Sequence, residues 1–221
     1  MVTPDKFILC YVTDRGSLDI AAGTDREADL AQRIRNAVCA GVHWVQIREK
    51  DLPARNLIDL TRSAIRACNN LSTQGAARIL VNDRCDVAWA AGAAGVHAGE
   101  KSLPVQVLID ARRTSGLTNF LVGASCHSVG GAIAAAEQGA DYLFFGPVFA
   151  TPSKAGFGPP QGLDKLAQVG GAVSIPVIAI GGITLENARA CREAGAAGIA
   201  AIRLFQQHGD LAKIVASLTA K

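Results

Sequence analysis

Short apolar runs alternate with longer amphipathic stretches along the whole chain. Four segments follow the same design, in which an Ala-rich helical stretch ends at a glycine and an apolar run comes next. They are residues 39–48, 90–99, 137–149 and 193–205. Glycine readily takes the left-handed conformation that ends many helices, and an unbroken apolar run is typical of a strand buried on both faces. The pattern therefore predicts helices that lead into parallel strands.

Four further apolar runs, residues 7–13, 78–83, 120–125 and 176–182, bring the predicted strands to eight. Helical segments such as 26–40 and 186–196 lie between them, and we expect Thr184 to cap the second of these. Eight alternations in 221 residues predict a single (β/α)8 TIM barrel domain over residues 1–221. A doubly wound sheet shares the alternation, but the first strand has no G-x-G-x-x-G turn, and polar residues follow many strands rather than lining one crevice.

Composition and charge narrow the class of protein. Hydrophobic residues make up 49% and charged residues 19% of the chain, which suits a soluble globular protein with a substantial core. The net charge is +3 without a block of Lys or Arg, and the first apolar run is too short to span a bilayer, so we expect neither a nucleic-acid nor a membrane partner. Six cysteines without a Cys-x-x-Cys pair are typical of reduced thiols in the cytoplasm. The oligomeric state stays open, a homo-oligomer included.

Polar residues follow the predicted strands where each strand ends. In a barrel these ends meet at one mouth, which is where barrel enzymes place their active sites. The residues are Gln46, Arg48 and Lys50; Asn82 and Asp83; His97; Ser125 and His127; Thr151, Ser153 and Lys154; Gly181 and Gly182; and Ile202 and Arg203.

Two anion sites are predicted at this mouth. Side chains alternate along a strand, so Gln46, Arg48 and Lys50 share one face. With Lys154 they would form a cationic site, and Asp83 is placed where a divalent metal could bridge a carboxylate and a diphosphate. On the opposite side, Gly181 and Gly182 let backbone N–H groups approach a phosphate, and Arg203 adds a positive charge.

Simpler explanations stand beside these two sites. The cations could pair with Glu49, Asp51 or Asp83 at the rim, and the two glycines could serve a tight turn only. His127 shares a face with Ser125 and could transfer a proton, whereas His97 could simply form hydrogen bonds across the barrel mouth.

With these segments in order, the chain resembles thiamine phosphate synthases, in the wider family that also includes the thiazole tautomerases. The resemblance rests on residues 45–51, 79–99, 122–128, 139–154, 176–183 and 194–202. It implies that segment 46–50, Glu49 included, binds hydroxymethylpyrimidine diphosphate together with Asn82, Ser125 and Lys154, and that Asp83 binds Mg²⁺. It further implies that Thr151 and Ser153 meet the carboxylate of the thiazole phosphate, and that Gly181, Gly182, Ile202 and Arg203 take its phosphate.

The reaction implied by the resemblance is dissociative substitution, in which diphosphate leaves, the thiazole nitrogen captures a pyrimidine methylene cation, and CO2 is lost. The residues assigned to catalysis are Arg48, Lys50, Lys154, Ser125 and His127. The family pattern places an aspartate that binds Mg²⁺ after the fourth strand, but residues 99–104 read GEKSLP, with Ser102 at that position. The usual serine after the eighth strand is Arg203 here.

Loss of that aspartate favours a rival function. A thiazole tautomerase needs no Mg²⁺ and would use His127 as its acid and base. A non-catalytic sensor of thiazole or thiamine phosphate and a generic phosphate-binding isomerase are further alternatives. The synthase is the favoured interpretation, because a tautomerase has no use for the cationic face of residues 46–50.

Overall fold

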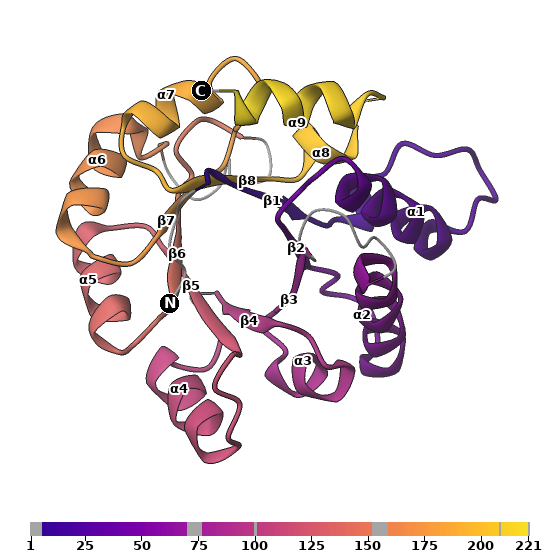
Figure 1. Ribbon diagram of the computed structural model, residues 1–221, viewed down its shortest axis with the longest axis horizontal. Helices are drawn as coiled ribbons and strands as arrows, with labels where there is room; N and C mark the ends of the chain where they lie inside the picture. The colour runs from indigo at the N-terminus through magenta and orange to yellow at the C-terminus, as the bar shows by residue number, and fades with distance from the viewer. Residues whose placement is uncertain (1–5, 70–76, 100, 152–158, 208, 221) are drawn as a thin grey trace.

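The eight predicted strands form one closed parallel barrel in the computed structural model, which describes residues 6–69, 77–99, 101–151, 159–207 and 209–220. Each strand pairs with the next along the chain, and the last pairs with the first through Tyr11 and Ala201. The strands are β1 (Ile8–Val12), β2 (Trp44–Ile47), β3 (Arg78–Asn82), β4 (Gly95–Ala98), β5 (Leu121–Cys126), β6 (Tyr142–Phe145), β7 (Val177–Ile180) and β8 (Gly198–Ala201). The TIM barrel prediction is confirmed, and Figure 1 shows the ring of strands inside a ring of helices.

Helices follow the strands and cover the outside of the barrel. They are α1 (Arg26–Cys39), α2 (Ala54–Asn69), α3 (Cys85–Ala91), α4 (Val105–Thr114), α5 (Val129–Glu137), α6 (Gly162–Ala172), α7 (Ala188–Glu193), α8 (Arg203–Gln206) and α9 (Leu211–Thr219), with a 3-10 turn η1 (Arg15–Ser17) after β1. Gly92 ends α3 in the left-handed conformation, with φ 74°, as the helix–glycine–strand pattern predicts. In the part of the chain that the structure describes, no helix is long and apolar enough to cross a membrane.

Side chains fill the barrel interior toward the end where the strands begin, so the barrel encloses a packed core there. The edge of the Trp44 ring packs on Tyr142, with ring centroids 4.7 Å apart. A Cβ at Gly123 would lie 2.0 Å from Cζ of Tyr142, so only glycine leaves room for this ring to cross the interior. Alternate residues such as Val45 pack outward against the helices.

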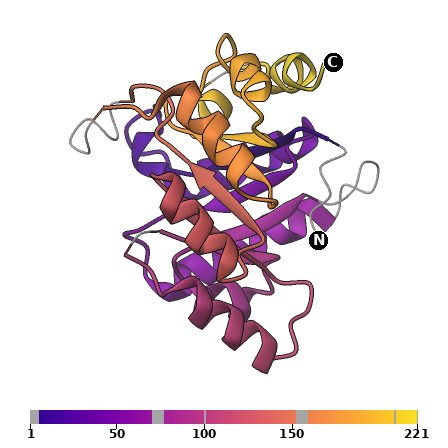
Figure 2. The same ribbon diagram turned by 90° about the vertical axis from the view of Figure 1, so that its left-hand side faces the viewer.

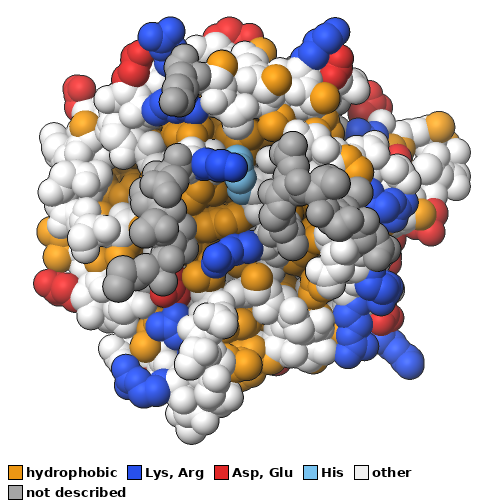
Figure 3. All heavy atoms as spheres, in the orientation of Figure 1, with side chains coloured by type: hydrophobic (Ala, Val, Ile, Leu, Met, Phe, Trp, Pro, Cys, Tyr) orange, Lys and Arg blue, Asp and Glu red, His pale blue; other side chains and the backbone are white. Residues whose placement is uncertain are grey.

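The polar residues lie at the end of the barrel where the strands finish. Figure 2 shows the barrel from the side, with the strands running away from the face that Figure 1 presents. Figure 3 has the orientation of Figure 1, so it shows the end of the barrel where the strands begin, opposite the mouth. Lys and Arg side chains and a histidine gather near the centre of this end. The described histidine at this opposite end is structural, because Nδ1 of His43 accepts from the backbone N–H of Leu9 at 3.0 Å.

Candidate active site

A row of amide and carboxylate groups crosses the mouth from β2 to β3. The Gln46 side chain is 2% exposed and points inward, and its Nε2 donates to Oδ1 of Asn82 at 2.7 Å. The Asn82 Nδ2 in turn donates to Oδ2 of Asp83 at 2.7 Å. The other end of the first amide, Oε1 of Gln46, is buried without a hydrogen-bond partner among the described residues. Buried acceptors are nearly always paired, so this oxygen points to a donor supplied by a ligand.

The cations at the mouth are not neutralised by their neighbours. Within residues 6–69, 77–99, 101–151, 159–207 and 209–220, no carboxylate forms an ion pair with Arg48, Lys50 or Arg203. Two of the three acids considered as rim partners contact Arg15 instead, Asp51 at 2.8 Å and Glu49 at 3.9 Å. The third, Asp83, forms hydrogen bonds with its neighbours at the ends of β3 and β4. The alternative of a simple rim ion pair is therefore wrong for Arg48 and Lys50.

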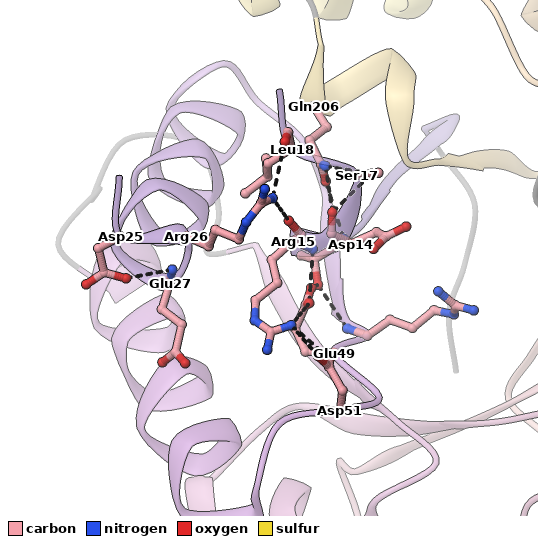
Figure 4. A network of polar contacts seen from close by, with 12 residues as sticks. Asp14, Arg15, Ser17, Leu18, Asp25, Arg26, Glu27, Glu49, Asp51 and Gln206 are labelled. Carbon is pink, nitrogen blue, oxygen red and sulfur yellow. Dashed lines mark hydrogen bonds and ion pairs between the residues drawn. The ribbon is translucent and has the colours of Figure 1, made fainter. Parts of the chain in front are cut away.

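Glu49 links the end of β2 to the segment after β1, on the side of β2 away from Gln46. Its Oε1 accepts from the Thr13 hydroxyl at 2.6 Å and its Oε2 from the backbone N–H of Arg15 at 3.0 Å, contacts that Figure 4 shows in part. Burial raises the pKa of this carboxyl, and the hydrogen bonds from Thr13 and Arg15 oppose the rise. Both oxygens are engaged on the side away from Gln46, so these contacts give Glu49 a supporting role, and its assignment to substrate binding stays a prediction.

A second support joins the end of β8 to the end of β1. The buried amide of Gln206 donates through Nε2 to the backbone oxygen of Asp14 at 2.7 Å and to the Ser17 hydroxyl at 3.0 Å. Its Oε1 accepts from the Tyr11 hydroxyl at 2.9 Å. Sequence reasoning missed Thr13, Arg15 and Gln206, because each acts through a partner distant in the chain. For Thr13 the one signal was its place directly after an apolar run, and Arg15 lies in a polar stretch that carries no such signal.

His97 holds Ser125 from inside the barrel. The imidazole is 1% exposed, with Nε2 2.9 Å from Oγ of Ser125 and Nδ1 3.1 Å from the Tyr142 hydroxyl. Burial lowers the pKa of His97 to about 3, against a smaller opposing effect of Asp83, so the ring is neutral near pH 7. The expectation that His97 forms hydrogen bonds across the mouth is confirmed.

Asp83 occupies a strained turn at the end of β3. Its φ is 61°, a left-handed conformation that is uncommon for a residue other than glycine and typical of functional sites. Its Oδ1 accepts from the backbone N–H of Gly99 at 3.0 Å and from the Ser102 hydroxyl, in addition to the Asn82 contact on Oδ2. The turn thus aims one exposed carboxylate along the rim.

The metal prediction concerns this carboxylate. No cluster of three or more His, Cys, Asp or Glu side chains suited to a metal is found among the residues that the structure covers. Mg²⁺ is commonly held by one or two carboxylates together with substrate phosphates and water. A site with Asp83 as its protein carboxylate fits that pattern when a diphosphate supplies the other oxygens, whereas a cage built from protein alone does not fit.

The β5 and β6 ends bring further predicted residues to the mouth. Nδ1 of His127 contacts the carbonyl oxygen of Gly146, which makes that nitrogen the donor. Thr151 is half-buried just beyond β6. Ser153 and Lys154 lie outside the described residues.

Gly181 and Gly182 follow β7 in left-handed conformations, with φ 95° and 65°. A Cβ at Gly182 would lie 2.6 Å from the backbone oxygen of Ala150, so the β6 loop packs directly on this turn. A tight turn therefore requires glycine here, and a phosphate site at the same place stays a prediction.

The segments after β7 and β8 form the last part of the mouth. Thr184 is not the helix cap as predicted: α7 begins at Ala188, and the Asn187 amide instead accepts from the Thr184 N–H and donates to the Gly182 carbonyl. Beyond β8, Ile202 precedes the short helix α8 and the exposed Arg203 is its first residue.

Comparison with known proteins matches this chain to one family over nearly its whole length. The family model described as thiamine monophosphate synthase matches residues 11–205. This chain belongs to the thiamine monophosphate synthase family.

Relatives in this family cover most of the chain. A thiamine-phosphate synthase of Methanoculleus marisnigri is 45% identical over 184 residues, which are 83% of each chain. One of Anaeromyxobacter dehalogenans is 44% identical over 175 residues, 79% of this chain and 75% of the relative. The solved structure of thiamine phosphate pyrophosphorylase from Pyrococcus furiosus is 32% identical, with a TM-score of 0.79 over 97% of this chain and 95% of that one. A 3-hexulose-6-phosphate synthase, 15% identical with a TM-score of 0.66, shares the fold alone.

Proposed function

We propose that this chain couples hydroxymethylpyrimidine diphosphate with carboxythiazole phosphate, releasing thiamine phosphate, diphosphate and CO2. Membership of the thiamine monophosphate synthase family supports the reaction, and the mouth of the barrel supplies groups of the right kind for both substrates. Both substrates are phosphorylated and do not cross a membrane unaided, so we place the reaction in the cytoplasm.

The observation that carries the proposal is Oε1 of Gln46, which has no hydrogen-bond partner among the described residues. Arg48 and Lys50, on the same strand face, form no ion pair within that part of the chain. A buried acceptor without a donor costs about 1–3 kcal/mol, so a ligand that brings an N–H group to this place gains affinity. The exocyclic amino group of an aminopyrimidine is such a donor. The proposal therefore puts the pyrimidine ring against Gln46, with Asn82 fixing the amide by its own hydrogen bond.

Arg48 and Lys50 then bind the diphosphate, and Lys154 is assigned to the same group. As the carbon–oxygen bond to diphosphate breaks, negative charge builds on the leaving group, and cations already in place stabilise it without reorganisation. Arg48 is held ready for this, because its backbone N–H donates to the Thr13 hydroxyl at 2.9 Å. The aminopyrimidine spreads the positive charge of the methylene cation, so no strong protein base is required.

Asp83 is the residue that would hold Mg²⁺. When bound, the metal would neutralise part of the charge on the leaving diphosphate. The strained turn at Asp83 and its contact with Asn82, which bonds to Gln46, support this assignment.

The thiazole phosphate is assigned to the other side of the mouth. Backbone N–H groups at Gly181, Gly182 and Ile202 would bind its phosphate, and the exposed Arg203 guanidinium would add a charged hydrogen bond. Thr151 and Ser153 are assigned to its carboxylate. Two substrates held on opposite sides of one mouth bring the thiazole nitrogen to the face of the pyrimidine cation, and positioning of this kind supplies a large part of a catalytic rate.

Thiazole tautomerisation is the less favoured function. It would rest on His127, whose Nδ1 already donates to the Gly146 carbonyl, and it leaves Gln46, Arg48 and Lys50 without a role.

A turnover assay tests the proposal. The purified protein would be incubated with carboxythiazole phosphate, with and without hydroxymethylpyrimidine diphosphate and Mg²⁺, and with each thiazole tautomer in turn. We expect thiamine phosphate to form only when both substrates are present. Interconversion of the tautomers without any coupling product would overturn the proposal in favour of the tautomerase.

A further inference from the structure

Three side chains form a single line of hydrogen bonds from the barrel core to its mouth. The Tyr142 hydroxyl contacts Nδ1 of His97 at 3.1 Å, and Nε2 of the same ring contacts Oγ of Ser125 at 2.9 Å. The tyrosine and the histidine are 0% and 1% exposed, while Ser125 is half-buried at the mouth. The line therefore has one closed end and one end that opens toward a ligand.

The closed end decides the direction of every hydrogen bond in the line. Among the described residues, the Tyr142 hydroxyl has His97 as its one hydrogen-bond partner. A neutral imidazole carries one N–H and one bare nitrogen. If Nδ1 carried the proton, the tyrosine proton would be buried without an acceptor, which is unfavourable. The tyrosine therefore donates to Nδ1, and the imidazole proton sits on Nε2.

The position of the imidazole proton also determines whether Ser125, at the open end, donates or accepts. Because Nε2 of His97 is a donor, Oγ of Ser125 is the acceptor in that hydrogen bond. The hydroxyl proton of Ser125 is then not used within the line, and the residue acts as a donor at the mouth. With the opposite tautomer the serine proton would point at the histidine, and only its lone pairs would face the ligand.

We infer that Tyr142 and His97 are positioning residues that set Ser125 as a hydrogen-bond donor toward an acceptor atom of the pyrimidine diphosphate. The inference rests on the proposed function for the identity of the ligand. It gives Gln46 and Ser125 opposite roles, since the first presents a buried acceptor and the second a donor. A ligand with an amino group and acceptor atoms, as an aminopyrimidine diphosphate has, satisfies both.

Gly123 makes this arrangement possible. Its missing side chain leaves the space that the Tyr142 ring occupies, and a Cβ there would lie 2.0 Å from Cζ of the ring. The ring is further fixed by Trp44 on one side and by Phe144, whose ring centroid lies 5.5 Å away. The hydroxyl that orients His97 is thus held by packing rather than by solvent.

Nitrogen NMR of the ligand-free protein tests the tautomer directly. With ¹⁵N-labelled histidine, the signals of His97 would be assigned by their loss in a His97→Gln variant. We expect a protonated Nε2 and a bare Nδ1 in the wild type, and a changed pair of signals in Tyr142→Phe. A wild-type His97 with its proton on Nδ1 overturns the inference.

Tyr11→Phe is the matched control for this spectrum. It also removes one buried tyrosine hydroxyl, but that hydroxyl donates to Oε1 of Gln206 at 2.9 Å and not to a histidine. We expect a similar loss of thermal stability with unchanged His97 signals. If Tyr11→Phe changes the His97 signals as much as Tyr142→Phe does, general loosening explains the effect and the inference fails.

A double-mutant comparison links the line to turnover. Tyr142→Phe should lower kcat about ten-fold by weakening one oriented hydrogen bond, and Ser125→Ala should lower it at least as much. In the Ser125→Ala background, Tyr142→Phe should have little further effect, because its action passes through the serine. Fully additive losses would overturn the inference.

The tautomer of His97 and the coupling reaction are tested by separate measurements. The tautomer is measured without substrate, so a wild type that makes no thiamine phosphate removes the proposed function and leaves the NMR result standing. A wild type that couples its substrates but protonates Nδ1 keeps the proposed function and loses the inference.

Discussion

The Thr13 hydroxyl donates to Oε1 of Glu49 at 2.6 Å and also accepts from the backbone N–H of Arg48 at 2.9 Å. The end of β1 therefore holds the end of β2 through one buried hydroxyl. Arg48 and Glu49 leave the strand on opposite faces, so the same hydroxyl that anchors Glu49 on the side away from Gln46 also fixes the backbone that presents Arg48 at the mouth.

Glu49 should give the stability of the protein a specific pH dependence. Burial raises its pKa in the folded chain, so as pH rises above the ordinary glutamate pKa the unfolded chain loses its proton first. The contribution of this group to the free energy of unfolding is thus highest in acid and falls as pH rises toward the raised pKa. In Glu49→Gln this fall should be absent. Thermal denaturation of both proteins across the acid range checks it, and parallel pH curves would contradict the assignment.

Arg48→Ala should lower kcat for coupling by about ten-fold or more, because it removes a charged contact that strengthens as diphosphate leaves. Lys50→Ala should act in the same direction. Arg189→Ala is the control, since Arg189 is an exposed cation on α7 that pairs with Glu193 at 2.8 Å and lies outside the mouth. Steady-state kinetics of the three variants checks this, and wild-type kcat in both mouth variants would rule out the diphosphate assignment.

Arg203→Ala should raise KM for the thiazole phosphate more than it lowers kcat. A contact with a remote phosphate stabilises substrate and transition state alike, so its loss weakens binding without slowing the chemical step to the same degree. Lys213→Ala removes an exposed cation of α9 and serves as the control. The two substrates should be varied separately; a raised KM for the pyrimidine diphosphate alone would exchange the two halves of the site.

Ser102→Asp should lower the Mg²⁺ concentration that gives half-maximal rate. In the wild type the Ser102 hydroxyl donates to Oδ1 of Asp83, and an aspartate there replaces this hydrogen bond with a second carboxylate. Like charges side by side favour a bound cation and destabilise the metal-free protein.

The melting temperature provides a readout of Ser102→Asp besides activity. Without Mg²⁺ the variant should melt below the wild type, and Mg²⁺ should restore more stability to it than to the wild type. Lys101→Ala, next to this position, separates a metal effect from an ammonium effect. Coupling that persists in excess chelator and does not respond to Ser102→Asp would contradict a metal at Asp83.

Gly182→Ala should destabilise the protein and impair binding of the thiazole phosphate. Its φ of 65° is unfavourable for alanine, and the new Cβ would lie 2.6 Å from the Ala150 carbonyl oxygen. Gly92→Ala is a matched control, because Gly92 has a similar φ of 74° but nothing within 4 Å of the new Cβ. We expect Gly92→Ala to cost about 1 kcal/mol of stability and to leave KM unchanged. Equal effects of the two variants would show that the β6 loop does not press on this turn.

Local patterns were enough to predict the barrel and which residues share a face of a strand. Left-handed glycines follow α1, α3, α5 and α7 within two residues, and the strands are short, mostly apolar runs. Both signals depend only on neighbours in the chain. The inward direction of Gln46 beside the outward Val45 follows from the period of a strand alone. The helix start predicted at Thr184 was wrong, because the turn after β7 is set by Asn187, which bonds back to the Gly182 carbonyl.

The sequence by itself determined the eight βα units, the end of the barrel at which the polar residues gather, and the family. Only the tertiary structure decided which of these residues are engaged and which remain available. Glu49 and Asp51 turned out to contact Arg15, and Arg48 and Lys50 form no ion pair with the residues that the structure describes. His97 contacts Tyr142, 45 residues further along the chain. The physical reason is that alternation along a strand is a local property. The partner of a buried polar group depends instead on which strands the closed barrel brings side by side, and at what height.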